Sequence, residues 1–127
     1  MTDVSPIIPA GRQVVESYGA GGFRISGERY EHAILLLPTQ TLPWAISDWD
    51  SVTTASLAPL HDAASAEPTT LLLGTGETQH FPSRAFKQEL RAQGLVIETM
   101  NTGAACRTYN VLMAEGRKVA AALLPVE

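Results

Sequence analysis

The fold of this chain is decided by residues 95–124, which read LVIETMNTGAACRTYNVLMAEGRKVAAALL. The segment opens with an apolar strand, Leu95–Thr99, and closes with a second one, Val119–Leu124. Between them the sequence predicts a helix that is capped by Asn101 or Thr102 and ends at a glycine. A strand, a helix and a strand with short connections predict two parallel strands joined by a right-handed crossover.

The same alternation of strands and helices extends toward the amino terminus. The apolar run Thr69–Leu73 predicts another strand, and Ser83 opens a helix that ends at Gly94. A shorter helix is predicted at about residues 53–64. The strands are continuously apolar rather than alternating, which is typical of a sheet with helices on both faces.

Before residue 50 the pattern is one of strands and turns. Phe23–Ile25 and Arg29–Leu37 flank the turn Ser26-Gly27-Glu28, so we expect them to pair as a β-hairpin. Pro38 ends the second strand, because proline cannot donate a hydrogen bond to a ladder. Thr39–Asp50 is expected to be a loop or an irregular strand.

The length of 127 residues, with 45% apolar and 17% charged residues, suits one globular domain. We expect an α/β fold: a single three-layer domain whose mostly parallel central sheet carries helices on both faces and an amino-terminal β-hairpin. Residues 1–17 are expected to form a flexible amino-terminal tail, and residues 18–127 the domain.

The composition argues against several classes of function. Nine basic residues against thirteen acidic ones give a net charge of −4, which argues against binding to nucleic acid or to anionic membranes. The single cysteine excludes an internal disulfide and fits a reducing compartment. The leucine-rich apolar run Ala33–Leu37 falls far short of the roughly twenty residues of a membrane span. We therefore expect a cytoplasmic protein without membrane insertion, metal or cofactor.

One segment has the properties of a binding site. Residues 100–110 begin where a predicted parallel strand ends and continue into the first turn of a helix, where ligands collect in open α/β sheets. Free backbone N–H groups there attract an anion, Gly103 permits close approach, and Arg107 adds a cation. The alternative is structural: Thr102 caps the helix, and the small side chains pack it closely against the sheet. The candidate ligand- or partner-binding residues are Gly74, Thr75, Gly76, Asn101, Thr102, Gly103, Cys106, Arg107 and Asn110.

Two members of this segment have alternative roles. Cys106 lies near the positive end of the helix, beside Arg107, a setting that lowers a thiol pKa and favours a nucleophile. A lone cysteine is also commonly a small buried apolar side chain, so its catalytic role is only a candidate one. Arg107 either binds an anion or pairs with a buried carboxylate such as Glu98, and the structural pairing is preferred.

Two other features are less specific. Gly74-Thr75-Gly76 follows a strand as a phosphate loop does, but it lacks the remaining residues of such motifs, and a tight turn is the simpler interpretation. Trp44 and Trp49 either mark a partner surface or pack inside the protein.

Several motifs together resemble a known family. They are the run Phe23–Gly27, the strand Ile34–Pro38, Trp44, Gly74–Gly76, Met100–Thr102, the run Ala104–Asn110 and Glu115–Arg117. The chain resembles the bacterial branch of the Mth-type domain of unknown function over about residues 18–126. That resemblance implies a three-layer α/β fold. The family also includes the mitochondrial assembly factor 3 of NADH dehydrogenase (respiratory complex I) and the adipogenesis-associated Mth-domain protein.

The resemblance also implies a class of function. It implies a non-enzymatic protein that binds protein partners and aids assembly, with a link to respiratory complex I. The alternative is a domain that binds a small molecule or anion, or an enzyme, using the helix start at Thr102–Arg107 together with Cys106.

Overall fold

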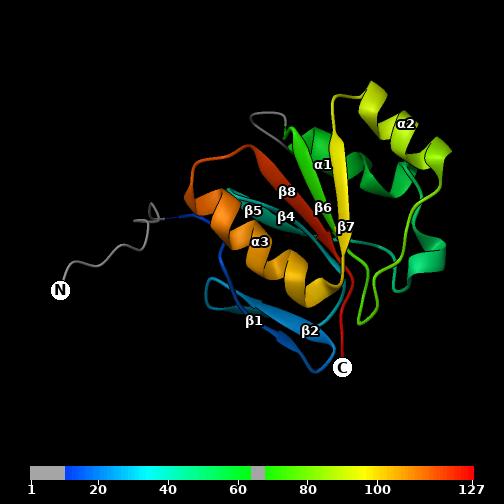
Figure 1. The fold of residues 1–127 in the computed structure, drawn as a ribbon. Helices are drawn as coiled ribbons and strands as arrows, with labels where there is room; N and C mark the ends of the chain where they lie inside the picture. Colours follow the sequence, from blue (N-terminus) through cyan, green and yellow to red (C-terminus); the bar gives the residue numbers. More distant parts are fainter. Residues whose placement is uncertain (1–10, 64–67) are drawn as a thin grey trace.

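The computed structural model describes residues 11–63 and 68–127, and Figure 1 shows its layers. A five-stranded sheet in the order β5-β4-β8-β6-β7 stands in the middle, and a smaller sheet in the order β1-β2-β3 lies beside it. The strands are β1 (Val15–Gly19), β2 (Gly22–Ile25), β3 (Glu28–Tyr30), β4 (Ile34–Leu37), β5 (Gln40–Pro43), β6 (Thr70–Gly74), β7 (Val96–Met100) and β8 (Val119–Leu123). The helices are α1 (Ala58–Ala63), α2 (Arg84–Ala92) and α3 (Thr102–Ala114), with 3-10 turns η1 (Trp49–Ser51) and η2 (Ala55–Leu57).

The middle strand, β8, explains the three layers. All five of its residues are buried, and they alternate between the two faces of the central sheet. Val119, Ala121 and Leu123 face a cluster that includes α3 and the small sheet. Ala120 and Ala122 face a second cluster with η2, α1 and α2. Helices therefore cover both faces, as predicted, and the small sheet completes one of the layers.

The central sheet is mixed rather than mostly parallel, which corrects one detail of the predicted fold. The pairs β6–β7 and β6–β8 are parallel, whereas β4 runs antiparallel to both β5 and β8. The reason is the short turn after Leu37: it makes β4 and β5 a hairpin, because so few connecting residues allow only antiparallel pairing. Thr39–Asp50, expected to be a loop or an irregular strand, accordingly contains strand β5 and the start of the turn η1.

The predicted long strand Arg29–Leu37 is in fact two strands in two sheets. Strand β3 pairs with β2 in the small sheet, and β4 belongs to the central sheet. Polarity explains the division, because Glu28 and Arg29 are exposed whereas Ile34–Leu37 are fully buried. The two halves therefore suit different environments. The expected hairpin is confirmed only for the β2–β3 part.

The expected tail, residues 1–17, also needs correction at its end. Residues 1–10 lie outside the described residues. The same holds for residue 64, where the short helix predicted at about residues 53–64 was expected to end. Residues 15–17 belong to β1, which pairs antiparallel with β2. Only Val15 of β1 is buried, so the strand carries little apolar pattern that a sequence reading can detect.

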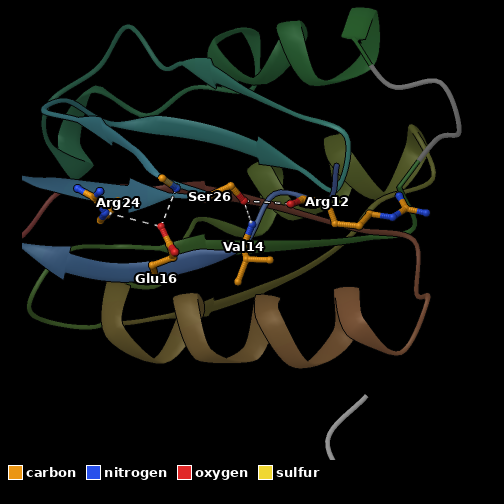
Figure 2. Close-up of polar contacts among 6 residues, drawn as sticks. Arg12, Val14, Glu16, Arg24 and Ser26 are labelled. Carbon is orange, nitrogen blue, oxygen red and sulfur yellow. Dashed lines mark hydrogen bonds and ion pairs between the residues drawn. The ribbon is translucent and has the colours of Figure 1, made fainter. Parts of the chain in front are cut away.

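Polar contacts hold this first strand in place, as Figure 2 shows. The Ser26 hydroxyl accepts a hydrogen bond from the Val14 N–H at 2.9 Å and donates one to the Arg12 carbonyl at 3.0 Å. Glu16 accepts from the Gly27 N–H at 2.6 Å and lies 3.7 Å from the Arg24 guanidinium. The Ser26 side chain thus ties the β2–β3 turn to the residues before β1, and the Glu16 side chain ties β1 to the same turn and to β2.

Candidate functional site

The loop after β6 and the start of α3 lie together at the carboxyl end of the parallel strands. The Thr102 N–H donates to the Gly76 carbonyl at 2.8 Å, and the Thr75 N–H donates to the Met100 carbonyl at 3.0 Å. The proximity of two groups of candidate residues, Gly74–Gly76 and Asn101–Gly103, is therefore established. It follows from parallel pairing of β6 with β7, which brings both strand ends to the same edge.

Thr102 links the segments of this region, and we call it the joint for that reason. Its side chain is completely buried, and its hydroxyl donates to the Leu124 carbonyl at 2.6 Å while it accepts from the Gly76 N–H at 2.9 Å. One hydroxyl thus joins the first turn of α3, the loop after β6 and the segment after β8. Both of its hydrogen bonds are internal, so Thr102 holds the site together and is not presented to a ligand.

The glycine-threonine-glycine loop is held in the same way. A Cβ atom on Gly74 would lie 2.8 Å from Leu123 Cδ2 and 3.1 Å from Thr102 Cα, so glycine is needed for close packing. The buried Thr75 hydroxyl donates to the Thr78 carbonyl at 2.7 Å and accepts from the His80 N–H at 3.0 Å. These contacts favour the interpretation of a tight turn over that of a phosphate loop.

A shallow cleft of about 330 Å³ lies outside this joint. It is lined by Tyr18, Gly76, Glu77, Asn101, Gly103, Arg107 and Val126. Asn101 caps α3, since its side-chain oxygen accepts from the Ala104 N–H at 2.9 Å. The cleft carries one cation, Arg107, and one carboxylate, Glu77, so its charge is balanced rather than strongly positive.

Sequence reasoning missed three residues that line the cleft, Tyr18, Glu77 and Val126, and of these Tyr18 makes the closest contacts to the candidate residues. Its hydroxyl accepts a hydrogen bond from Arg107 Nη1 at 3.0 Å, and its ring lies over Gly103, where a Cβ atom would be 2.5 Å from the hydroxyl oxygen. Close approach at Gly103 was expected, but by a ligand. Tyr18 lies 89 positions before Arg107, and no local signal connects the two.

The expected pairing of Arg107 with Glu98 is wrong. Both side chains are exposed, and none of the ion pairs within residues 11–63 and 68–127 joins them. Arg107 projects from α3 toward Tyr18 instead. The guanidinium is therefore an accessible cation at the mouth of the cleft.

Cys106 is a buried side chain rather than an activated nucleophile. Only 2% of it is exposed, and it packs in the cluster between α3 and the sheet. Burial raises the pKa of the thiol to about 12, and the nearby Arg107 charge lowers it by less than burial raises it. The expectation of a lowered pKa is thus overturned, because desolvation outweighs the helix end and the adjacent cation.

Asn110 also proves structural. Its side-chain oxygen accepts from the Val15 N–H at 2.9 Å, and its amide nitrogen donates to the Val15 carbonyl at 2.8 Å. The side chain therefore pairs with β1 as a neighbouring strand would and fixes the small sheet against α3. Asn110 is not among the residues that line the cleft.

The two tryptophans have different roles. Trp44 is 4% exposed, and its indole N–H donates to the Ser56 carbonyl at 3.1 Å, so it belongs to the core. Trp49 is half-buried and stacks on the His80 ring, with 5.8 Å between centroids and 11° between planes. Beside it is a second cleft of about 230 Å³, lined by Trp49, Asp50, Val52, Phe81, Pro82, Ser83 and Phe86.

Phe81 is the most exposed large apolar side chain described, at 74%. We call Trp49, Val52, Phe81 and Phe86 the aromatic patch. The sequence analysis named only Trp49 of this patch as a possible partner-surface residue. Phe81 was missed, although a phenylalanine directly before the Pro82-Ser83 helix start, outside any apolar periodicity, was a detectable signal. Across residues 11–63 and 68–127, no group of three or more histidine, cysteine, aspartate or glutamate side chains has an arrangement that fits a metal ion.

Comparison with known proteins identifies the family. The model of the family described as "Protein of unknown function (DUF498/DUF598)" matches residues 15–124. The chain belongs to this family. It is 32% identical over 112 residues to human NADH dehydrogenase [ubiquinone] 1 alpha subcomplex assembly factor 3, covering 87% of this chain. The matched region spans 60% of the human protein's length.

Solved structures of the family share the fold. The solution structure of a Mth938-like domain from Bordetella pertussis is 30% identical, with a TM-score of 0.80, and covers 98% of this chain and 92% of that chain. The crystal structure of a Bartonella henselae protein described as an outer membrane protein is 33% identical, with a TM-score of 0.82, covering 92% of this chain and 98% of the other. In the present family member, none of the helices described is both long and apolar enough to cross a membrane. The predicted resemblance to the Mth-type domain is confirmed.

The structural role of Thr102 predicts a clear mutational contrast. Thr102→Val keeps the shape of the side chain but leaves the Gly76 N–H and the Leu124 carbonyl without their buried partner, so we expect a loss of about 1–3 kcal/mol in the free energy of unfolding. Arg107→Gln removes one exposed hydrogen bond and should change stability by less than about 0.5 kcal/mol. Urea unfolding of both variants measures this. Equal losses would contradict the assignment of Thr102 as the joint.

The buried thiol predicts a specific alkaline destabilisation. Below pH 8 both the folded and the unfolded chain keep the Cys106 proton; between pH 9 and 12 only the unfolded chain releases it, because folding raises the thiol pKa from 9.0 to about 12. Stability therefore falls as pH rises, by about 1.4 kcal/mol between pH 8 and pH 10 from this group.

Comparison with Cys106→Ala isolates that contribution, since every other titrating group is unchanged. Urea unfolding at pH 8 and pH 10 should show the larger decrease in the wild type. Parallel decreases in the two proteins would mean that the thiol is accessible to water in the folded state.

Proposed function

We propose that this protein is a non-enzymatic protein-binding module that aids the assembly of a larger complex. The exposure of Phe81 is the observation that carries the proposal. A phenylalanine in water is unfavourable, and an exposed apolar cluster of this kind is typical of an interaction surface. Aromatic side chains are also the residues that supply most binding energy at protein interfaces.

The aromatic patch is held in a fixed conformation on both sides of Phe81. Before it, the His80 N–H donates to the buried Thr75 hydroxyl and the His80 ring stacks on Trp49. After it, the Ser83 hydroxyl accepts from the Phe86 N–H at 3.1 Å and caps α2. The backbone that carries Phe81 is thus held in place before binding, so a partner loses little affinity to ordering of this segment.

Relatives suggest the partner. The human relative is named as an assembly factor for NADH dehydrogenase, so we propose that the partner here is a subunit or assembly intermediate of respiratory complex I. Under this proposal the protein acts in the cytoplasm. The buried Cys106 thiol, with its raised pKa, supports a role without nucleophilic chemistry. The small-anion alternative receives less support, because Glu77 lies in the same cleft as Arg107.

A binding experiment tests the proposal directly. Tagged wild-type protein and a Phe81→Ala variant are returned to a deletion strain, and bound complex I subunits are quantified by mass spectrometry together with the amount of assembled complex I. We expect Phe81→Ala to lower recovery about tenfold or more, as loss of a central aromatic anchor does. Stability should be nearly unchanged, since the side chain is exposed.

Val111→Ala provides the matched control. Val111 is 57% exposed on α3, which covers the opposite face of the sheet from α2, so its truncation removes a similar exposed apolar side chain outside the patch. Equal recovery with Phe81→Ala and Val111→Ala would argue against the aromatic patch. Unchanged complex I in the deletion strain would argue against the link to that complex.

A further inference from the structure

Strand β7 forms an outer edge of the central sheet and has an unused side. In the part of the chain that the structure describes, it pairs only with β6. The Val96 N–H donates to the Thr69 carbonyl at 2.9 Å, and the Met100 carbonyl accepts from the Thr75 N–H, so these two residues direct their backbone groups toward β6. Because successive residues of a strand alternate, Ile97 and Thr99 direct theirs outward.

Most of the outward groups have no partner. The Thr99 carbonyl accepts from the Gln79 side-chain amide at 2.8 Å, which closes the end of the edge near the loop. The Ile97 N–H, the Ile97 carbonyl and the Thr99 N–H remain unpaired among the described residues. An exposed edge of this kind is a template for another extended chain.

A positively charged groove borders this edge. It has a volume of about 320 Å³ and is lined by Arg84, Lys87, Gln88, Arg91, Leu95, Val96 and Ile97. The three cations recur at spacings of three and four residues, which places them on one side of α2. No ion pair of the described residues involves any of them, and no carboxylate lines the groove.

The neighbouring carboxylates belong to other surfaces. Glu98 alternates with Ile97 along β7, and Ile97 packs on the α2 face of the sheet, so Glu98 faces the opposite side. Glu89 lies on α2 but at a helical position turned away from the three cations. The net charge of the chain is −4, so these three unpaired cations form a positive surface on a negatively charged protein. Such a surface favours a negatively charged binding partner.

We infer that β7 and this groove bind an acidic extended segment of a partner protein, which adds to the central sheet as a sixth strand. The unpaired backbone groups of Ile97 and Thr99 supply the strand pairing. Arg84, Lys87 and Arg91 recognise acidic side chains on the α2 side of the added strand. The inference rests on the proposed protein-binding function and adds the chemistry of the partner.

A second copy of this chain suits the groove poorly. Antiparallel pairing of β7 with β7 of another copy follows a two-fold axis perpendicular to the sheet, so both α2 helices would lie on the same face. Their rows of arginine and lysine would then face each other across the interface, and like charges there are unfavourable. Charge thus favours an acidic partner over self-association.

The test uses the full-length protein and a peptide of alternating glutamate and valine as the probe. Amide hydrogen exchange, followed by NMR, reports on individual N–H groups. In the free protein the Ile97 and Thr99 amides should exchange faster than the Val96 amide, which is already paired with Thr69. The peptide should slow the exchange of Ile97 and Thr99 at least tenfold, and a peptide of alternating lysine and valine should not.

A triple variant tests the charges. Arg84→Gln, Lys87→Gln and Arg91→Gln together should weaken binding of the acidic peptide at least tenfold at low salt, and the wild-type affinity should fall as salt is added. The matched control, Arg24→Gln with Arg117→Gln and Lys118→Gln, removes the same charge from other exposed positions and should leave the affinity nearly unchanged.

Several results would overturn the inference. They are an absence of protection at Ile97 and Thr99, equal weakening by both triple variants, and protection that depends on protein concentration without peptide. Binding of duplex DNA or of phosphatidylserine vesicles through the three cations, without protection of these amides, would also overturn it. Failure of the proposed function is separate, because it is measured by complex I recovery with Phe81→Ala, whereas the peptide test does not involve Phe81.

Discussion

The burial of β8 on both of its faces is the constraint from which the rest of the architecture follows. Its three alanines and two larger apolar residues are at most 1% exposed, so the strand is stable only with a layer on each side. The small side chains also let α3 approach closely, and Ala105 of α3 packs in the same cluster. One layer is then α3 with the small sheet, and the other is formed by η2, α1 and α2.

The segment that follows β8 carries this constraint into the candidate site. The Leu124 carbonyl accepts from the Thr102 hydroxyl, and the Leu124 N–H donates to the Gly74 carbonyl at 2.9 Å. The carboxyl edge of the sheet, where an α/β protein commonly binds its ligand, is therefore occupied by internal hydrogen bonds. What remains accessible there is the shallow cleft lined in part by Tyr18 and Arg107. The other surfaces that could bind a partner, the aromatic patch and the groove beside β7, lie away from this edge.

The parts of the structure that sequence predicts well are those with long, regular apolar patterns. Strands β6, β7 and β8 and helices α2 and α3 have such patterns and capping residues, and their predicted order is the observed one. Strand β1 was missed because only one of its residues is buried, and β5, expected only as a loop or an irregular strand, has no fully buried side chain. The conformation of both strands therefore depends on partners elsewhere in the fold. Cys106 shows the same limit in the site: its neighbours in sequence favour a low pKa, but burial is a tertiary property and determines the direction.

Helix α2 joins the two peripheral surfaces. Phe86 belongs to the aromatic patch, while Arg84 and Lys87, on another side of the same helix, line the groove beside β7. Apolar anchors supply affinity but little orientation, whereas strand pairing and charge fix direction and register. A partner that contacts both surfaces would thus be held at a defined angle to the central sheet. Under the proposed binding function the protein would act on a partner by such positioning, and α2 is the element whose two sides supply it.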